Sequence, residues 1–409
     1  MEMGDKGARW SRRAALAGLA SALAACSPGS LQWGSRSFSL PWAGDGANTG
    51  GLSPIASAPK EQFGRGRVNV ALLLPLSGNA ALSQLGTALA NASKLAIGFI
   101  EANPNIGENI TISLRDTGDS AAGATSAANA AVADGAKLIL GPVTAEQVSA
   151  AGAAARAANI PLIGFANNSA VAMPGVYVLN VLPETEMKRA VRYLRDQGRR
   201  GPAGIFPATP YGEALATAFR QQAIAAGFNP GAVYTFSNIS EAQQIVDQAR
   251  PLIERGAIDA LVMPDRASAP TFASLLAQAG ATPETVQLVG SADWANDPAL
   301  LGNPALAGAI FPAVDEAGLN AIRADYAARF GGNPPQMATI AYTATILANV
   351  NTLSLATPPY EASLLTNPAG FAGRDGLFRL YANGRSDYAL VIRQISAGGV
   401  TRPVDGAKL

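Results

Sequence analysis

The sequence predicts an α/β protein of two lobes, each an open parallel sheet covered by helices. The chain has 409 residues, which is more than one hydrophobic core usually serves. Hydrophobic residues make up 48% of the chain and charged residues 14%, a composition typical of a well-packed globular protein. Short apolar runs alternate with Ala-rich helical patterns, and this alternation is typical of parallel sheets covered by helices.

The first series of elements begins with a continuously apolar run. This run, 68–74, ends at Pro75 and precedes a helical pattern rich in Ala and Leu at 80–102. The later strands and helices of this series are expected at 110–116, 121–134, 138–141, 145–158 and 161–165.

The second series begins at Pro183 and again alternates helices with short strands. Its helices are expected at 184–197, 213–226, 240–254 and 269–279, and its strands at 203–207, 232–236, 259–263 and 286–290. Beyond Ala309 the pattern changes to two helices, and it then predicts a hairpin around the turn Asn383-Gly384. These last elements are expected at 319–330, 339–356, 376–380 and 389–395.

The composition excludes several classes of protein. The chain has no histidine, which removes Ser-His-Asp and Cys-His catalysis, His-ligated metals and imidazole bases. Thirty basic residues oppose 29 acidic ones without a dense basic run in the mature region, so no nucleic-acid partner is expected. No phosphate-binding loop, dinucleotide motif or nucleophile elbow occurs. We therefore expect a binding protein rather than an enzyme, with no catalytic residue, no metal and no cofactor.

The N-terminus has the pattern of an export signal. Arg9, Arg12 and Arg13 precede a short apolar run that closes on Leu23-Ala24-Ala25-Cys26. This closing string resembles the lipobox of bacterial lipoproteins, which implies a signal peptide at 1–25 and lipidation of Cys26. A signal without lipidation, followed by a chance Cys, is the alternative. The string at 11–16 also resembles a twin-arginine signal, so the export route stays open.

Residues 26–67 are rich in Gly, Ser, Pro and Asn and are predicted to be a flexible linker behind the lipid. The lipid would hold the protein on the membrane at the periplasmic face of the cell envelope. The lipoprotein resemblance favours the outer membrane, because Ser27 rather than Asp follows the Cys.

Several strings resemble the type I periplasmic binding proteins of the leucine/isoleucine/valine-binding kind. They are Leu74-Pro75-Leu76-Ser77-Gly78, Gly141-Pro142, Asn159-Ile160-Pro161-Leu162-Ile163 and Tyr211-Gly212. The resemblance covers about 68–395 and implies two open parallel-sheet lobes with three crossovers, near Pro183, Pro312 and Pro358. The implied division is lobe one at 68–182 plus 313–357, and lobe two at 183–312 plus 358–409.

A second set of strings resembles the penicillin-binding protein activator lipoproteins. It comprises Asp293-Trp294 with Gly308-Ala309, and the string at 373–380 with Asn383-Gly384. This resemblance implies a regulator of peptidoglycan synthesis whose partner is a peptidoglycan synthase. The general resemblance implies instead a substrate-binding lipoprotein of an ABC transporter, which presents an amino acid or related solute to a permease. A scaffold with an empty crevice is a third option.

Ligands of open α/β sheets bind outside the carboxyl ends of the strands, so the loops there form the candidate site. We expect them to hold a small polar ligand such as an amino acid or a muropeptide. The candidate ligand-binding residues are Ser77, Gly78, Thr144, Asn167, Asn168, Ser169, Tyr211, Asp265, Asp293 and Trp294. The alternative for Ser77 and Thr144 is a helix cap, and the alternative for Gly78 is a tight turn. Sequence spacing does not determine whether any two of the loop carboxylates come together as an acid/base pair.

Two positions depart from the amino-acid binders of this superfamily. Those proteins usually hold the α-carboxylate through a Ser or Thr just after the Gly-Pro turn, where this chain has Thr144 followed by Ala145. They commonly carry an Asp where Thr343 stands. Recognition of an amino acid is therefore only one of the expectations.

Overall fold

The computed structural model describes residues 31–33, 36–38, 61–229, 232–295 and 297–409. The chain divides into two compact units, Met1–Ala56 and Ser57–Leu409. In the first unit, β1 (Leu31–Trp33) pairs antiparallel with β2 (Arg36–Phe38), so the predicted linker is not free of regular structure. The predicted signal peptide and Cys26 lie outside the described residues.

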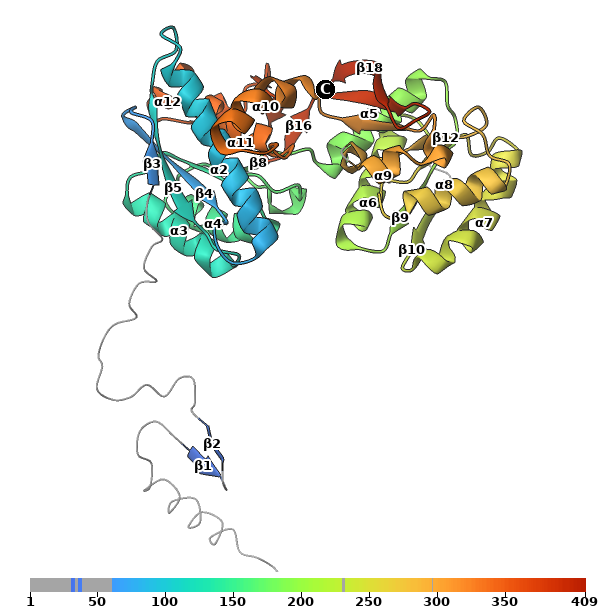
Figure 1. The fold of residues 1–409 in the computed structure, drawn as a ribbon, viewed down its shortest axis with the longest axis horizontal. Coiled ribbons are helices and arrows are strands. Elements are labelled where there is room, and N and C mark those ends of the chain that lie inside the picture. Colours follow the sequence, from blue (N-terminus) through green and yellow to red (C-terminus); the bar gives the residue numbers. More distant parts are fainter. Residues whose placement is uncertain (1–30, 34–35, 39–60, 230–231, 296) are drawn as a thin grey trace, which may run out of the picture. The chain divides into compact units, whose positions relative to one another are not determined.

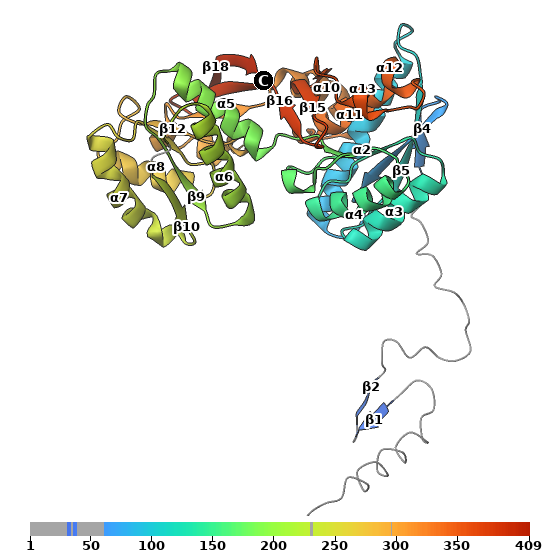
Figure 2. The same cartoon turned by 180° about the vertical axis from the view of Figure 1, so that it is seen from behind.

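Two mainly parallel sheets organise the described residues of the second unit (Figure 1 and Figure 2). The first sheet has the strand order β3-β5-β4-β6-β7-β8. Its neighbours pair in parallel except for β3 and β5, which are antiparallel. The strands are β3 (Glu61–Phe63), β4 (Val68–Leu74), β5 (Ile110–Asp116), β6 (Leu138–Leu140), β7 (Leu162–Gly164) and β8 (Val176–Val178). The sequence pattern predicted four of these strands, but not β3 and β8.

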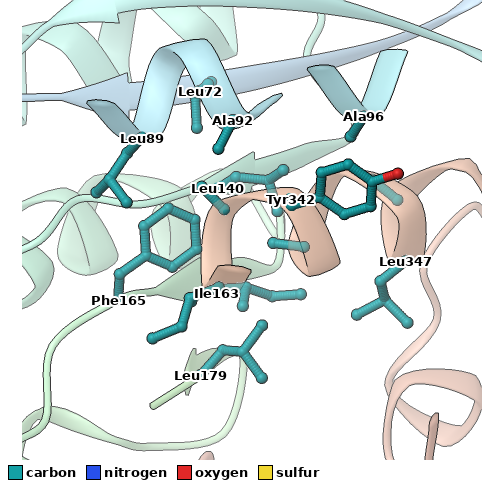
Figure 3. Close-up of a cluster of buried hydrophobic side chains, with 14 of the residues drawn as sticks. Leu72, Leu89, Ala92, Ala96, Leu140, Ile163, Phe165, Leu179, Tyr342 and Leu347 are labelled. Atoms are coloured by element: carbon teal, nitrogen blue, oxygen red, sulfur yellow. The ribbon is translucent and has the colours of Figure 1, made fainter. Parts of the chain in front are cut away.

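Helices cover both faces of the first sheet because successive side chains of a strand point to opposite faces. Leu72 belongs to the hydrophobic cluster beneath α2 and α11, which Figure 3 shows, whereas Leu73 belongs to the cluster beneath α3 and α4. These helices are α2 (Ala80–Glu101), α3 (Ala121–Ala133), α4 (Ala145–Ala157) and α11 (Ala338–Asn349). A strand buried on both faces must be apolar throughout, which explains the continuous run at 68–74.

The second sheet has the strand order β10-β9-β11-β12-β13-β17-β18. The strands from β9 to β13 are parallel, and β17 and β18 are antiparallel to their neighbours. They are β9 (Pro202–Pro207), β10 (Val233–Phe236), β11 (Ala260–Val262), β12 (Gln287–Val289), β13 (Ile310–Ala313), β17 (Leu390–Ile395) and β18 (Thr401–Lys408). This sheet is therefore mixed at one edge, where a purely parallel sheet was predicted.

Helices also cover both faces of the second sheet. Met187 and Phe219 lie in the cluster that α5 and α6 form with one face, and Ile245 and Phe272 lie in the cluster of α7 and α8 on the other. The helices are α5 (Pro183–Asp196), α6 (Pro210–Ala225), α7 (Ala242–Glu254) and α8 (Ala269–Gln278). All four lie within a few residues of their predicted ranges.

The remaining elements are short, apart from α10 (Ala317–Phe330), which packs against α2. They are η1 (Ser169–Val171), η2 (Ile239–Glu241), η3 (Ala292–Trp294), η4 (Pro304–Leu306), α9 (Pro298–Leu301), α12 (Asn351–Ser354), α13 (Ala362–Leu365), β14 (Phe371–Gly373), β15 (Gly376–Leu380) and β16 (Ser386–Tyr388). The helix predicted at 339–356 is divided at Val350 into α11 and α12. Across the ranges that the structure describes, no helix is long and apolar enough to cross a membrane.

The predicted hairpin around Asn383-Gly384 is half correct. β15 has the predicted bounds and lies in a hairpin, but its partner is β16, which ends at Tyr388 and was not predicted, instead of the strand expected at 389–395. From Leu390 the chain pairs instead with β13 of the second sheet, because it changes sheets at Ala389.

Within 61–409, apart from its gaps, the chain therefore passes between the sheets three times: from β8 to α5, from β13 to α10, and from β16 to β17. The third crossing was predicted near Pro358, which is wrong. Residues between there and Tyr388, such as Tyr360 and Phe378, pack in the hydrophobic cluster of the first sheet. We accordingly place 358–388 with lobe one, and the rest of the predicted division stays a prediction.

Candidate ligand-binding crevice

A crevice of about 300 Å³ lies where the chain passes between the sheets. Each crossing in the described chain contributes to its wall: Val181 precedes α5, Val314 follows β13, and Tyr388 ends β16. Its volume is in the range of small-molecule sites. The wall consists of Asn167, Asn180, Val181, Glu186, Tyr211, Arg266, Ala292, Asp293, Ala295, Ala313, Val314, Glu316, Gln336, Met337, Ile340, Asp375 and Tyr388.

Glu186, on the first turn of α5, is the most deeply buried acid of the second-lobe wall, with 3% of its surface exposed. Its Oε2 accepts a hydrogen bond of 2.8 Å from the backbone N–H of Ala292, and its Oε1 lies 3.4 Å from the hydroxyl of Tyr211. Burial is the main cause that raises the pKa of Glu186 to about 8, and the nearby Asp293 raises it further. Glu186 is therefore mostly protonated at neutral pH.

Asp293, on η3, faces the crevice beside Glu186. Partial burial raises its pKa, and Asp265 acts in the same direction, whereas the positive charge of Arg266 lowers it. Arg266 is exposed in the loop before α8 and also lines the crevice. The second-lobe wall therefore combines acidic groups with a guanidinium.

Asp375 is the buried acid of the opposite wall, in the turn between β14 and β15, and is 3% exposed. Its Oδ2 accepts a hydrogen bond of 2.8 Å from the hydroxyl of Thr339, and its Oδ1 accepts one of 3.0 Å from the side-chain amide of Gln336. Burial raises the pKa of Asp375 to about 6, against the effect of these two hydrogen bonds. Its ionisation therefore occurs below neutral pH, but not far below.

Tyr388 lies next to this acid and is 2% exposed. Burial, and then the charge of Asp375, raise the pKa of its hydroxyl. Within the residues described, this hydroxyl has no hydrogen-bond partner. The ring adds to an apolar part of the wall that includes Val314, Met337 and Ile340. The crevice is thus amphipathic, with fixed polar groups beside an apolar surface.

Three of the ten predicted site residues line the crevice: Asn167, Tyr211 and Asp293. They come from the loop after β7, from the start of α6 and from the loop after β12. The loops at the carboxyl ends of the strands therefore contribute part of the crevice wall from each lobe.

The seven other predicted residues lie outside this wall, and four of them form hydrogen bonds in nearby turns and helix ends. Thr144 caps α4 by accepting a hydrogen bond from the N–H of Gln147. Asn168 caps η1, and Asp265 accepts from the N–H of Ser268 at the start of α8. Ser169 donates to Glu184 at 2.6 Å. The capping alternative thus describes Thr144 in this structure.

Ser77 and Gly78 lie in an exposed turn after β4. Ser77 bonds to Asp116, and this contact together with backbone N–H groups lowers the pKa of Asp116 despite partial burial. Gly78 has a φ of +87° and lies against the carboxylate of Asp119, so a side chain there would be strained and would collide. These residues join the β4 and β5 loops to each other.

Trp294 was expected to face a ligand, and the structure corrects this. Its side chain is fully buried, its indole N–H donates to the carbonyl of Pro264 at 3.1 Å, and its ring packs on Phe311. The 3₁₀ turn of η3 directs the ring back into the core of the second sheet, while the preceding Asp293 faces the crevice.

Three further residues of the wall were not predicted from the sequence: Glu186, Asp375 and Tyr388. Glu186 lies in the first turn of α5, where acidic residues are common. The available signal was its place beside the apolar Met187 and Ala190, close to the buried face of the helix. Asp375 and Tyr388 were part of the predicted hairpin region, but without a function. As for metals, no group of three or more Asp, Glu, Cys or His residues suited to an ion occurs in the described ranges.

Two α/β lobes joined by three crossings, with a crevice against those crossings, define the fold of type I periplasmic binding proteins. The chain belongs to the periplasmic binding protein family, whose model matches residues 67–401. A comparison with curated proteins finds no match.

Solved structures share the fold at low sequence identity. A chain from Rhodospirillum rubrum, described as a branched-chain amino acid ABC transporter, is 21% identical with a TM-score of 0.70, and the match covers 82% of this chain and 99% of that chain. A leucine-, isoleucine-, valine-, threonine- and alanine-binding protein from Brucella ovis is 16% identical with a TM-score of 0.61, covering 83% and 94%.

A solute binding protein of an ABC transporter from Rhodopseudomonas palustris, in complex with 3,4-dihydroxybenzoic acid, is 18% identical with a TM-score of 0.56, covering 83% and 98%. These similarities establish the fold. The three proteins are described as transport or solute-binding proteins rather than as enzymes.

Proposed function

We propose that this chain is the substrate-binding protein of an ABC transporter, which captures a small polar or amphipathic solute and presents it to a membrane permease. The observation that carries the proposal is the crevice, whose wall takes residues from both lobes and from each described crossing. A ligand there contacts the segments about which two such lobes move, so its binding can alter their relative position. The family and the transport proteins that share the fold support this function.

The proposed ligand contacts are those that the crevice brings together. From the predicted set they are Asn167, Tyr211 and Asp293, and the structure adds Arg266 and Glu186 on the second-lobe wall. Fixed hydrogen-bonding groups beside an apolar surface suit binding better than reaction, and we propose no catalytic role.

A thermal-shift screen of the purified protein tests the function. The panel contains amino acids, small peptides, muropeptides and aromatic acids. A ligand at 100 times its dissociation constant should stabilise the folded state by about 2.7 kcal/mol. Arg266→Ala should change the affinity of any charged hit, weakening an anionic ligand and strengthening a cationic one, whereas Arg255→Ala, at an exposed position at the end of α7, should leave the affinity unchanged. No shift with any compound would contradict the proposal.

Activation of a peptidoglycan synthase is a second candidate. The observation that favours it is the sequence at 373–380 with Asn383-Gly384, which resembles activator lipoproteins, together with the long segment between Cys26 and β3 that could provide reach. The solute-binding relatives support transport over this candidate. A reconstituted glycan-polymerisation assay decides between them, because a transport protein should leave the synthase rate unchanged and an activator should raise it.

We also propose that Cys26 is lipidated and anchors the chain at the periplasmic face, with the outer membrane favoured. The lipobox-like string before Cys26 and the membership of the periplasmic binding protein family support this. Labelled palmitate should be incorporated into the wild-type protein and not into Cys26→Ser. Separation of inner and outer membranes then locates the labelled protein.

A further inference from the structure

The charged side chains of the crevice wall are mostly acidic. Among the described residues that line it there are four carboxyl groups and one guanidinium, namely those of Glu186, Asp293, Glu316, Asp375 and Arg266. Although Glu186 is mostly protonated at neutral pH, the other acidic side chains still outnumber the one guanidinium, so an anionic ligand would meet like charges and a cationic ligand would be attracted.

Two of these carboxyl groups have a cation nearby. Oε1 of Glu316 is 3.6 Å from the guanidinium of Arg393. The charge of Arg266 acts on Asp293 and lowers its pKa against the effect of burial. Local cations therefore partly balance these two acids.

Glu186 and Asp375 are not balanced in this way. The hydrogen-bond partners of Glu186 are neutral, namely the N–H of Ala292 and the hydroxyl of Tyr211, and Asp375 accepts from a hydroxyl and an amide. In the part of the chain that the structure describes, neither carboxyl group forms an ion pair. A buried carboxylate without a cation is costly, which is why burial raises both pKa values.

The buried hydroxyl of Tyr388 independently indicates that the crevice binds a polar ligand group. Tyr388 lines the crevice and has 2% of its surface exposed. Its hydroxyl has no hydrogen-bond partner among the described residues. Buried polar groups are nearly always hydrogen-bonded, so an unpartnered hydroxyl in a ligand-sized crevice points to a ligand atom. An ammonium has three donors and can serve both this hydroxyl oxygen and the neighbouring Asp375.

Resting on the proposed solute-binding function, we propose that the crevice is selective for an organic cation, a protonated amine or guanidinium, whose charged group binds at Glu186 or at Asp375 with Tyr388. The cation supplies the positive partner that no described side chain provides to these two buried carboxyl groups. Its apolar part lies on Val314, Met337 and Ile340. The inference is specific to this set of side chains and differs from recognition of a ligand through its carboxylate.

Isothermal titration of the purified wild-type protein with three matched probes provides the first test. n-Pentylamine, pentanamide and pentanoate have closely similar size and differ in charge, and agmatine and putrescine extend the cationic set. We expect the amines to bind at least about tenfold more tightly than the amide, and pentanoate to bind most weakly. If the amine binds at Glu186, binding at neutral pH should also release the proton of this carboxyl group. The measured heat of binding should then depend on the ionisation enthalpy of the buffer.

Variants identify the groups that hold the cation. Glu186→Gln and Asp375→Asn keep hydrogen-bonding capacity but cannot ionise, and at least one should lower amine affinity about tenfold without strengthening pentanamide. Tyr388→Phe should weaken amines bound at Asp375 severalfold. Glu184→Gln is the matched control, because Glu184 is on the same turn of α5 but contacts Ser169 and Arg385 outside the crevice wall.

The outcomes separate the two proposals. If pentanoate or leucine binds and the amines bind no better than the amide, solute binding stands and selectivity for a cation is overturned. If no probe and no compound of the wider screen binds, both proposals are overturned. The comparison of probes uses only the wild-type protein, so it remains decisive even if a variant fails to fold.

Discussion

The carboxyl group of Glu186 holds its proton more tightly in the folded protein than in the unfolded chain. Burial raises its pKa from the usual 4.5 to about 8. Between these pH values the folded protein keeps a proton that the unfolded chain has released, so the free energy of unfolding falls as the pH rises. The expected slope is about 1 kcal/mol per pH unit, and it disappears above the folded pKa.

We therefore predict that Glu186→Gln flattens this pH dependence. Urea unfolding at pH 6.5, 7.25 and 8 is the suitable measurement, because Asp375, whose pKa is raised only to about 6, contributes little there. The variant should gain stability relative to the wild type with each step, since glutamine cannot ionise. Glu184→Gln should keep the wild-type slope, and identical slopes for Glu186→Gln and wild type would contradict the prediction.

At this scale the sequence distinguished poorly between residues that look alike. Tyr211 and Trp294 both follow buried strands, yet Tyr211 lines the crevice and Trp294 lies in the core. The difference arises from one turn of 3₁₀ helix, which no local pattern revealed. Glu186 was overlooked because its role depends on Ala292 and Tyr211, which are distant in the sequence and reach it only through tertiary packing.

Among the helices, α4 illustrates how a residue can look like a ligand contact and serve as a cap. The Thr144 hydroxyl accepts from the N–H of Gln147, one of the helix N–H groups that have no partner within the helix itself. Glu146 in the first turn and Arg156 in the last suit the helix dipole.

We predict that Thr144→Ala lowers the free energy of unfolding by about 1 kcal/mol and that Thr144→Ser largely retains it. Denaturant unfolding of the three proteins measures this. Affinity for any ligand found in the screen should be unchanged, because Thr144 is outside the crevice wall. A large loss of affinity in Thr144→Ala would instead assign Thr144 to the site, as its position in the sequence first suggested.

Elements buried on both faces were predictable because their sequences are continuously apolar. β4 and β5 have the predicted bounds, and α2 differs by one residue. β8 and β14 have three residues each, too few to show a period, and β18 is largely exposed and polar. The return arm was predicted at 389–395, but residues 386–388 pair with β15 and the strand from Leu390 pairs with β13, a division that depends on which sheet offers an edge.

In the molecule as a whole, one polar cluster joins the first crossing to the third. Asp387, on β16, pairs with Lys188 of α5 and accepts hydrogen bonds from Thr185 at 3.3 Å and Tyr381 at 3.2 Å. β16 packs with the core of the first sheet, whereas α5 packs on the second. The cluster therefore ties the two lobes together next to Ala389.

We predict that Asp387→Asn loosens this connection. Removing the charge should lower the free energy of unfolding by about 1 to 3 kcal/mol, because Lys188 loses its partner and Asp387 is buried. Hydrogen exchange should become faster at 184–188 and 386–390 and stay unchanged in β4. Equal protection at the crossings in both proteins would show that the cluster does not restrain them.

The division into two α/β lobes was predictable because it follows from repeated local patterns. The crevice was predictable only in part, since its wall depends on where the crossings meet. Gln336 and Asp375 illustrate the rest: they are far apart in the sequence and come together only after α11 packs on the first sheet and β14 pairs with β15.

The place of Tyr388 at the end of β16, one residue before the chain changes sheets, gives the crevice a mechanical character. Tyr388, Val181 and Val314 all lie at crossings between the lobes. A solute that contacts them therefore touches the segments about which the lobes would rotate, and not the outer parts of the lobes. A small rotation about the crossings moves the far ends of the lobes much further than it moves the crevice. Under the proposed transport function, a permease could then sense an occupied crevice at loops that never touch the solute.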